Sequence, residues 1–242
     1  MFTVKNKTQQ PGEPSPVQTQ VETSVSEAAT ETAVMVAPTL LPHESFDEAS
    51  GEIISKYKYL EGHPRQYRFD AKEGSFNING SQKLGRTLTF QPIAWRIFTD
   101  NILKMGTKNW AEIFFIDEKK CVSAVLFHGY SVDNLYKLIE PLYYDDLTLA
   151  DVVITAVAEK KENAKIQPKG VYYIADFTYK LANPVETAEL KSFAKAVKLF
   201  RQETVTDVAQ IKTSLNYFYP FAEQEEHLFE QSDEPQPARL TE

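Results

Sequence analysis

Polar and apolar residues alternate with a period of two through most of the middle of the chain, which is typical of half-buried β-strands. Strands are predicted at 67–80, 86–98, 111–116, 121–128, 150–161 and 170–180. The first range divides into two short strands around a polar turn, and the second breaks at Pro92, which cannot donate a ladder hydrogen bond. The third and fourth ranges predict one β-hairpin, and the last two predict another.

The apolar spacing becomes helical at two places. The stretch SVDNLYKLIEPLYYDD (131–146) predicts a short helix with Ser131 as its N-cap, and Pro141 limits its length. Between residues 183 and 220 we predict a pair of amphipathic helices, because Asn183 before Pro184 is typical of an N-cap followed by a first-turn proline. Two apolar stripes define this pair: Leu190, Phe193, Val197 and Phe200, and then Val208, Ile211, Leu215 and Phe218.

Both ends of the chain are too polar to form a packed core. Residues 1–49 are rich in Gln, Thr, Ser, Pro and Glu and are predicted to be disordered, with a boundary near Ser50. Seven acids lie from Glu223 onward against Arg239, which predicts a second disordered, acidic segment. The expected organisation has four parts: a disordered 1–49, a β domain at 50–182, a helical extension at 183–220 and a disordered tail at 221–242.

The net charge of −8 is spread unevenly along the 242 residues. Residues 1–49 hold two bases against seven acids, and residues 186–242 hold six against eleven. Residues 50–185 hold eighteen bases against sixteen acids, and within them 56–108 hold ten against four. An acidic chain with a basic centre is compatible with a polyanionic partner.

Cys121 is a single cysteine and cannot form an intramolecular disulfide, which suits a reducing compartment. The N-terminus lacks a basic stretch followed by an apolar run, and Pro38 interrupts the most apolar early segment. Neither a signal peptide nor a membrane span is expected, and we expect a cytoplasmic protein.

The order strand, two-stranded hairpin, helix and two further strands is the order of the OB-fold, a five-stranded, partly open Greek-key barrel. Over residues 86–181 this order resembles single-stranded DNA-binding proteins of phages, plasmids and bacterial chromosomes. The resemblance implies an OB-like barrel whose long first strand serves both halves, with Pro92 as its bend. An acidic C-terminus that recruits partner proteins also occurs in the bacterial family, although this chain ends in PARLTE instead of an acidic-Pro-Phe tip. The strands at 67–80 form an additional N-terminal hairpin.

A ligand of such a barrel lies across the second and third strands, between the loops after the first and fourth strands. Both loops carry lysines here, and aromatic side chains beside them are suited to stacking on bases. The predicted nucleic-acid-binding residues are Arg86, Trp95, Arg96, Lys104, Lys108, Trp110, Lys160, Lys161, Lys165, Lys169, Tyr172 and Tyr173. In the alternative interpretation, the lysines only solubilise exposed loops, and Trp95 and Trp110 belong to the core.

Signals for catalysis are sparse. Asp145, Asp146 and Asp151 lie close together, which leaves open a divalent metal site or simply the end of a helix. The four histidines are scattered, and the sequence contains no motif for nucleotide hydrolysis, dinucleotide binding, zinc proteolysis or serine hydrolysis. No catalytic residue, metal ion or cofactor is expected.

Two functions of different classes follow from these patterns. The first is sequence-tolerant binding of single-stranded DNA in replication or recombination, without enzymatic activity; the residues do not separate DNA from RNA. The second is a protein-interaction or structural module that docks on a partner, or on a second copy, through the helices at 183–220. Protein partners could also be recruited by the acidic tail, and the sequence leaves the oligomeric state open.

Overall fold

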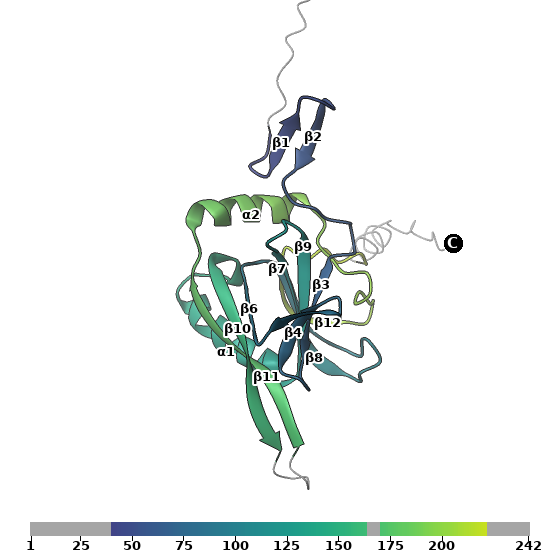
Figure 1. Cartoon of the computed structure of the whole chain (residues 1–242), viewed down its shortest axis with the longest axis vertical. Helices are drawn as coiled ribbons and strands as arrows, with labels where there is room; N and C mark the ends of the chain where they lie inside the picture. The colour runs from purple at the N-terminus through teal and green to yellow at the C-terminus, as the bar shows by residue number, and fades with distance from the viewer. Residues whose placement is uncertain (1–39, 164–169, 222–242) are drawn as a thin grey trace, which may run out of the picture. The chain divides into compact units, whose positions relative to one another are not determined.

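The computed structural model describes residues 40–163 and 170–221, which form a mainly β protein (Figure 1). The described strands make a two-stranded sheet β1-β2, a three-stranded sheet β11-β10-β6 and a seven-stranded sheet β12-β7-β8-β9-β3-β4-β5. Their bounds are β1 Glu44–Asp47, β2 Glu52–Ser55, β3 Arg65–Asp70, β4 Ser75–Ile78, β5 Gln82–Gly85, β6 Thr87–Phe90, β7 Pro92–Asp100, β8 Lys108–Ile116, β9 Val122–His128, β10 Val152–Asn163, β11 Gly170–Leu181 and β12 Gln210–Leu215. Two α-helices, α1 Tyr130–Tyr144 and α2 Pro184–Ala196, and one 3-10 turn, Leu149–Asp151, complete the described elements.

One continuous segment, from Thr87 to Asp100, serves both of the larger sheets. Its first part, β6, pairs with β10, and its second part, β7, pairs with β8. The change of sheet occurs at Gln91, whose side-chain amide donates to the carbonyl of Ala150 and to Thr187 Oγ1, each at 2.9 Å. The predicted break at Pro92 is confirmed.

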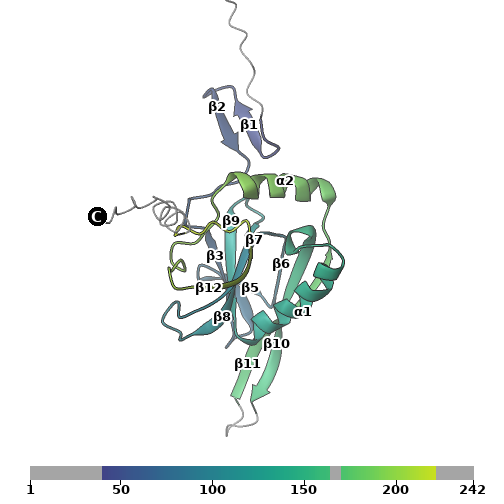
Figure 2. The same cartoon turned by 180° about the vertical axis from the view of Figure 1, so that it is seen from behind.

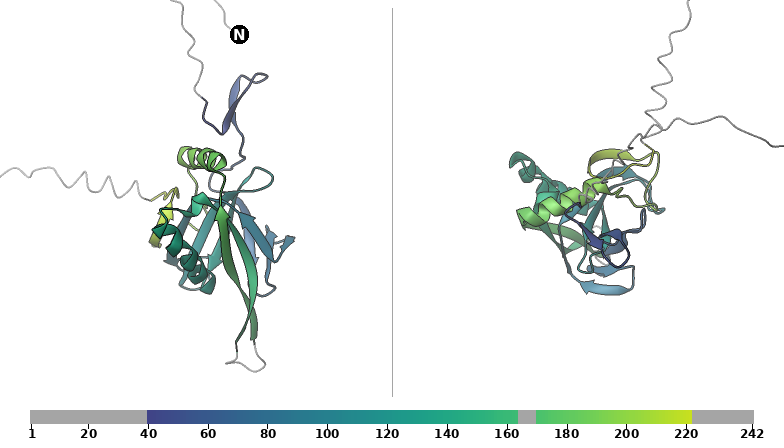
Figure 3. Two further views of the ribbon diagram at one scale, coloured as in Figure 1. Left: turned by 90° about the vertical axis from the view of Figure 1, so that its left-hand side faces the viewer. Right: turned by 90° about the horizontal axis from the view of Figure 1, so that it is seen from above.

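The main core lies between these two sheets and against α1. The two predicted hairpins, β8–β9 and β10–β11, contribute apolar side chains to it together with α1 and strands β3, β4, β6 and β7, and the strands predicted within 67–80 are β3 and β4. Large rings from three elements meet there: Phe76, Phe115 and Phe127 are at most 2% exposed. In Figures 1 and 3, α2 crosses one end of the sheets, and the β10–β11 hairpin extends from the other end.

The predicted five-stranded barrel is not closed among the described residues. β9 pairs in parallel with β3, not with β11. The free edge of β11 is capped instead: the backbone N–H of Ala175 donates to Ser131 Oγ at 2.9 Å, and its carbonyl accepts from Asn134 Nδ2 at 3.0 Å. Ser131 is therefore not the N-cap of α1; Gly129 takes that place. The backbone N–H of Tyr173 donates to the carbonyl of Ala71 at 2.8 Å.

The C-terminal region agrees with the sequence prediction in its first half only. Asn183 caps α2 by accepting a hydrogen bond from the N–H of Val185 at 2.9 Å. Leu190 and Phe193 pack into a second core on the other face of the seven-stranded sheet, so this stripe is covered within the molecule. The helix ends at Ala196, so the predicted stripe continues beyond the helix.

The second predicted C-terminal helix is wrong, because residues 210–215 form β12, which pairs with the edge of β7. A β-bulge between Ile211 and Thr213 lets Ile211 pair with Phe98 and Leu215 with Trp95, so the helix-like apolar spacing is accommodated in a strand on the open edge of β7. Residues 183–220 are thus part of the same folded unit as the sheets, and do not form a separate extension.

The predicted boundary near Ser50 falls inside the β1–β2 hairpin, so the segment expected to be disordered includes a strand. Residues 1–39 lie outside the described residues. At the base of the hairpin the ring of His43 packs edge-on against Phe193 at 5.2 Å between centroids. Tyr57 donates its hydroxyl to Glu189 of α2 at 2.8 Å.

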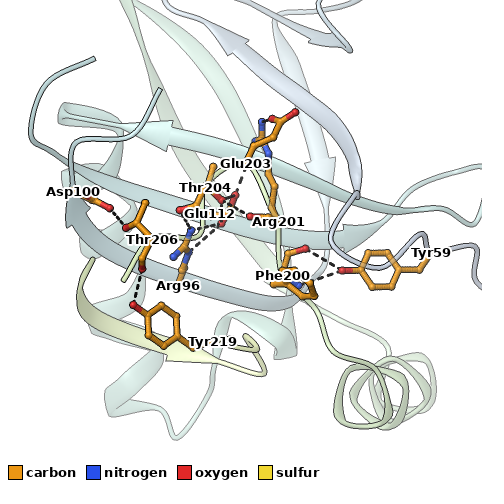
Figure 4. Close-up of polar contacts among 10 residues, drawn as sticks. All are labelled: Tyr59, Arg96, Asp100, Glu112, Phe200, Arg201, Glu203, Thr204, Thr206 and Tyr219. Atoms are coloured by element: carbon orange, nitrogen blue, oxygen red, sulfur yellow. Dashed lines mark hydrogen bonds and ion pairs between the residues drawn. The ribbon is translucent and has the colours of Figure 1, made fainter. Parts of the chain in front are cut away.

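The outer face of β7 and β8 is covered by the chain after α2, around a buried ion pair (Figure 4). Arg96 and Glu112 are both fully buried, with 3.0 Å between Nη2 and Oε2. Thr204 completes the pair: its hydroxyl donates to Glu112 at 2.8 Å, and its carbonyl accepts from Arg96 Nη2 at 2.8 Å. Figure 2 shows this face of the molecule.

Two aromatic rings and a second arginine surround the Arg96–Glu112 pair. The guanidinium of Arg96 lies 3.9 Å from the ring centroid of Phe98 and 4.4 Å from that of Tyr217, which are cation–π distances. Arg201, 5% exposed, lies 4.0 Å from Glu112 and 2.6 Å from Glu203. Among the described residues, neither helix is long and apolar enough to span a membrane.

We expect Glu112→Gln to lower the free energy of unfolding by about 3–5 kcal/mol, because it leaves two buried guanidinium groups without their shared carboxylate. The double variant Arg96→Met/Glu112→Leu should lose less, since it removes both charges. Urea unfolding followed by circular dichroism measures both. Glu140→Gln on the exposed side of α1 is the matched control, with an expected change within about 0.5 kcal/mol. A Glu112→Gln variant as stable as this control would contradict the prediction.

Candidate nucleic-acid interface

Three of the predicted site residues are buried and cannot contact a nucleic acid. Trp95 is 7% exposed and packs in the main core. Trp110 is 1% exposed, and its indole N–H donates to the carbonyl of Asp100 at 2.9 Å. Arg96 is held in the buried ion pair with Glu112. The prediction was wrong because β7 and β8 are covered on both faces, which an alternating pattern does not reveal.

The lysines predicted on the fourth-to-fifth strand loop are only partly available. Lys161 forms an ion pair with Glu159 at 2.6 Å, and Lys160 lies 3.6 Å from Glu162. Lys165 and Lys169 lie outside the described residues. The described part of the β10–β11 hairpin therefore has little uncompensated positive charge.

The groove between that hairpin and the start of α1 is also not cationic. It has a volume of about 400 Å³. Its charged lining residues are two lysines and three acids: Lys137, Lys161, Asp133, Glu159 and Asp176. A phosphate backbone would be repelled as much as attracted on this side.

The predicted first loop is a tight turn with exposed side chains. Leu103 and Lys104 both have positive φ, 54° and 57°, and the N–H of Met105 donates to the carbonyl of Ile102 at 3.2 Å. Lys104 is exposed at this turn, and Lys108 begins β8. In Figure 1 this loop lies at the side of the molecule beside β8, whereas the β10–β11 hairpin projects from its lower end.

A ring-lined pocket lies where β9 and β11 fail to pair. It has a volume of about 130 Å³ and lies among the end of β9, the β3–β4 turn, the start of α1 and β11. Its ring-bearing lining residues are Phe69, Phe127, His128, Tyr130, Tyr172 and Tyr173. We call it the β9–β11 pocket. Tyr172 and Tyr173 were predicted as site residues; Phe69, His128 and Tyr130 were not.

The β3–β4 turn is shaped to receive one of these rings. Gly74 has φ +65°, and a Cβ at this position would lie 2.4 Å from Tyr173 Cδ1. Any other residue would therefore displace the tyrosine ring as well as strain the turn. Tyr173 packs on the turn backbone and lies 5.2 Å from the guanidinium of Arg86. This contact places the predicted Arg86 beside the pocket.

The segment from β3 to β6, which includes the additional hairpin predicted at 67–80, carries positive charge near this pocket. Residues 65–90 hold five bases and two acids, a net charge of +3. Arg65 is paired with Asp117 at 2.8 Å, and Lys83 with Glu73 at 2.6 Å. Within the described ranges no ion pair is found for the exposed cations of these strands, Arg68, Lys72 and Arg86.

His128 connects the pocket to the start of β8. Its ring packs edge-on against Trp110 at 5.2 Å between centroids. Burial, and then the nearby positive charge of Lys108, hold the pKa of His128 below its ordinary value. At neutral pH the imidazole is therefore neutral, with one nitrogen donating and the other accepting.

Asp151, one member of the acidic cluster considered for a metal, has structural contacts. Asp151 accepts hydrogen bonds from the hydroxyl of Thr148 at 2.6 Å and from Lys191 Nζ at 2.6 Å. In the part of the chain that the structure describes, no three His, Cys, Asp or Glu side chains come together as a metal site would require.

Comparison with known proteins yields no relative. The chain matches no protein-family model, no curated protein and no solved structure.

We expect Lys108→Met to raise the pKa of His128, because it removes a positive charge that opposes protonation of the ring. NMR titration of the imidazole Cε1–H signal measures this, with Lys195→Met in α2 as the control that leaves the pKa unchanged. The folded pKa lies below the unfolded one, so this histidine makes unfolding easier as pH falls below about 6.5. An unchanged His128 titration in Lys108→Met would contradict the electrostatic assignment.

Proposed function

We propose that this protein binds single-stranded DNA without reading its base sequence, by base stacking and phosphate neutralisation, and that it has no enzymatic activity. The observation that carries the proposal is the β9–β11 pocket: a set of partly exposed rings beside a strand segment of net charge +3. Aromatic platforms next to a cationic track are the means by which such proteins bind single strands. Support of replication or recombination in the cytoplasm is part of the same proposal.

An OB-like architecture is consistent with the sheet arrangement. In an OB-fold the long first strand serves both halves of the barrel, and Thr87–Asp100 pairs with β10 through its first part and with β8 through its second. The hairpin β8–β9, the helix α1 and the hairpin β10–β11 follow in the order that the fold requires. The difference lies in the additional strands β3 to β5, which occupy the edge of β9.

The proposed path of the DNA is displaced from the usual OB surface. A ligand of that fold lies across the second and third strands, here β8 and β9. The outer face of β8 is covered around Glu112 by Arg201 and Thr204. We therefore place the strand at the free end of β9, crossing the β9–β11 pocket. Its phosphates would follow three cations: Lys72, Arg86 and Lys108.

The apolar stripe that suggested docking through the C-terminal helices is covered within the molecule. Leu190 and Phe193, which were expected to bind a partner, are 7% and 1% exposed and pack against the sheet of the same molecule. The second helix of the proposed docking pair is the strand β12.

Fluorescence anisotropy with a labelled oligothymidine tests the proposal. We expect affinity in the micromolar range or better at low salt, and a loss of affinity with rising salt of about 0.7 in log–log slope per neutralised phosphate. Arg86→Gln should lower this slope by about 0.7, because it removes one phosphate contact. Lys195→Gln, an exposed cation on α2, is the matched control.

Affinity no better than millimolar at low salt would overturn the proposal. An equal loss of salt slope in Arg86→Gln and Lys195→Gln would show that only net charge matters. It would overturn the placement of the DNA at the β9–β11 pocket. An oligouridine measured in parallel decides between DNA and RNA as the preferred strand.

Removal of residues 222–242 should tighten binding to oligothymidine at low salt. These residues carry seven acids and one arginine, and tethered anions compete with DNA phosphates at an effective concentration near millimolar. The gain should disappear at high salt, where the competition is screened. The same anisotropy titration measures the affinity of the truncated protein. A second variant, in which the acids of residues 222–242 are replaced by their amides, is titrated in the same way. Unchanged affinity in both would contradict competition by the tail.

A further inference from the structure

We infer that the β9–β11 pocket takes one unstacked pyrimidine base of the bound strand. The inference rests on the proposed function and goes beyond it, because it assigns a discrete base site to a protein proposed to bind without sequence preference. The pocket is a consequence of topology: β9 pairs with β3, and the facing edge of β11 is capped by Ser131, Asn134 and Ala71. The two strand ends therefore stay apart, and rings fill the space around the gap.

The size of the pocket selects a single ring. Its volume is about 130 Å³, close to the roughly 150 Å³ apolar cavity that accommodates benzene in an engineered protein. A pyrimidine has one six-membered ring, whereas a purine has two fused rings and would leave one outside. We therefore expect thymine or cytosine to be accepted, and adenine or guanine to be disfavoured at this position.

The lining suits a flat, partly polar ring. Phe127, 1% exposed, and the half-buried Phe69 and Ile174 provide apolar walls, against which the face of a base can pack. His128 provides a polar edge, and its neutral imidazole offers both a donor and an acceptor to the base edge. Tyr130, 67% exposed, lies at the mouth, where it can stack on a neighbouring base.

The cations near the pocket lie on sides from which a bound strand can place its phosphates while one base enters the pocket. Arg86 lies against Tyr173 on the side of the β3–β6 strands, and Lys108 lies near His128 on the side of β8. The groove on the third side, toward α1, is lined by Lys137 and Lys161 together with Asp133, Glu159 and Asp176, so it offers phosphate no net attraction. A strand that places its phosphates along the two cationic sides can turn a base into the pocket without facing these acids.

The test fills the pocket without removing a cation or a tyrosine. Ala71 lines the pocket, and Ala71→Leu should occupy it. Ala196→Leu, at the exposed end of α2, is the matched control. Anisotropy titrations with oligothymidine and oligodeoxyadenosine give the ratio of the two affinities for each protein. We expect Ala71→Leu to reduce the preference for thymidine by at least about fivefold, the lower end of one base's stacking contribution, and to leave the salt slope unchanged.

A second measurement uses a single nucleotide. Thymidine 5′-monophosphate should shift the imidazole NMR signal of His128 in the wild type and in Ala196→Leu, but not in Ala71→Leu. Deoxyadenosine 5′-monophosphate should shift it much less. If Ala71→Leu does not fold, Ile174→Phe fills the same pocket from the β11 side and replaces it in both measurements.

The outcomes separate this inference from the proposed function. A wild type that fails to bind oligothymidine at low salt overturns both. A wild type that binds with a steep salt slope, while the filled pocket keeps the full thymidine preference, overturns the base pocket alone.

Discussion

The free edge of β11 is hydrogen-bonded to a helix and a turn instead of to β9, and the candidate site depends on that arrangement. Ser131 and Asn134 satisfy both backbone groups of Ala175, and the carbonyl of Ala71 accepts from Tyr173. Buried backbone groups need partners, so these contacts remove the drive for β11 to pair with β9. β9 finds its partner in β3, and the gap between the two hairpins becomes a ring-lined pocket with a cationic border.

A second constraint moves the candidate site away from the middle of the sheet. The Arg96–Glu112 pair lies at the centre of β7 and β8 and is covered by the segment that follows α2. Removing either charge would leave the other unpaired in a dry environment, which costs several kcal/mol. A ligand cannot reach this face without displacing Thr204, so the surface left to a single strand is the end of β9 and its neighbours. The buried charges that stabilise the sheet and the surface that a ligand can reach thus lie in different parts of the same sheet.

Local patterns in the sequence predicted the elements whose structure is determined locally. The period of two located both long hairpins, Pro92 marked the change of sheet, and Asn183 before Pro184 marked the start of α2. Elements that depend on distant partners were missed. The apolar spacing that ends at Phe218 predicts a helix, whereas pairing with the edge of β7 makes residues 210–215 a strand. The β3–β9 pairing joins strands that are more than fifty residues apart in the sequence.

The candidate site was predicted only in part for the same reason. Tyr172, Tyr173 and Arg86 were chosen for their local setting, and the structure brings them together at the pocket. Arg96, Trp95 and Trp110 were chosen by the same rule and are buried, because burial on both faces is a property of the packed sheet. Phe69 and His128 come from strands that become neighbours only through the parallel pairing of β3 with β9.

Photo-crosslinking tests the location of the DNA most directly. A single-stranded oligonucleotide containing 4-thiothymidine, irradiated in complex with the full chain and followed by peptide mass spectrometry, identifies the residues in contact with bases. We predict crosslinks in the peptides that contain Phe69, Tyr130 and the Tyr172–Tyr173 pair. Crosslinks confined to α2 and to residues 199–219, with none at these rings, would contradict it.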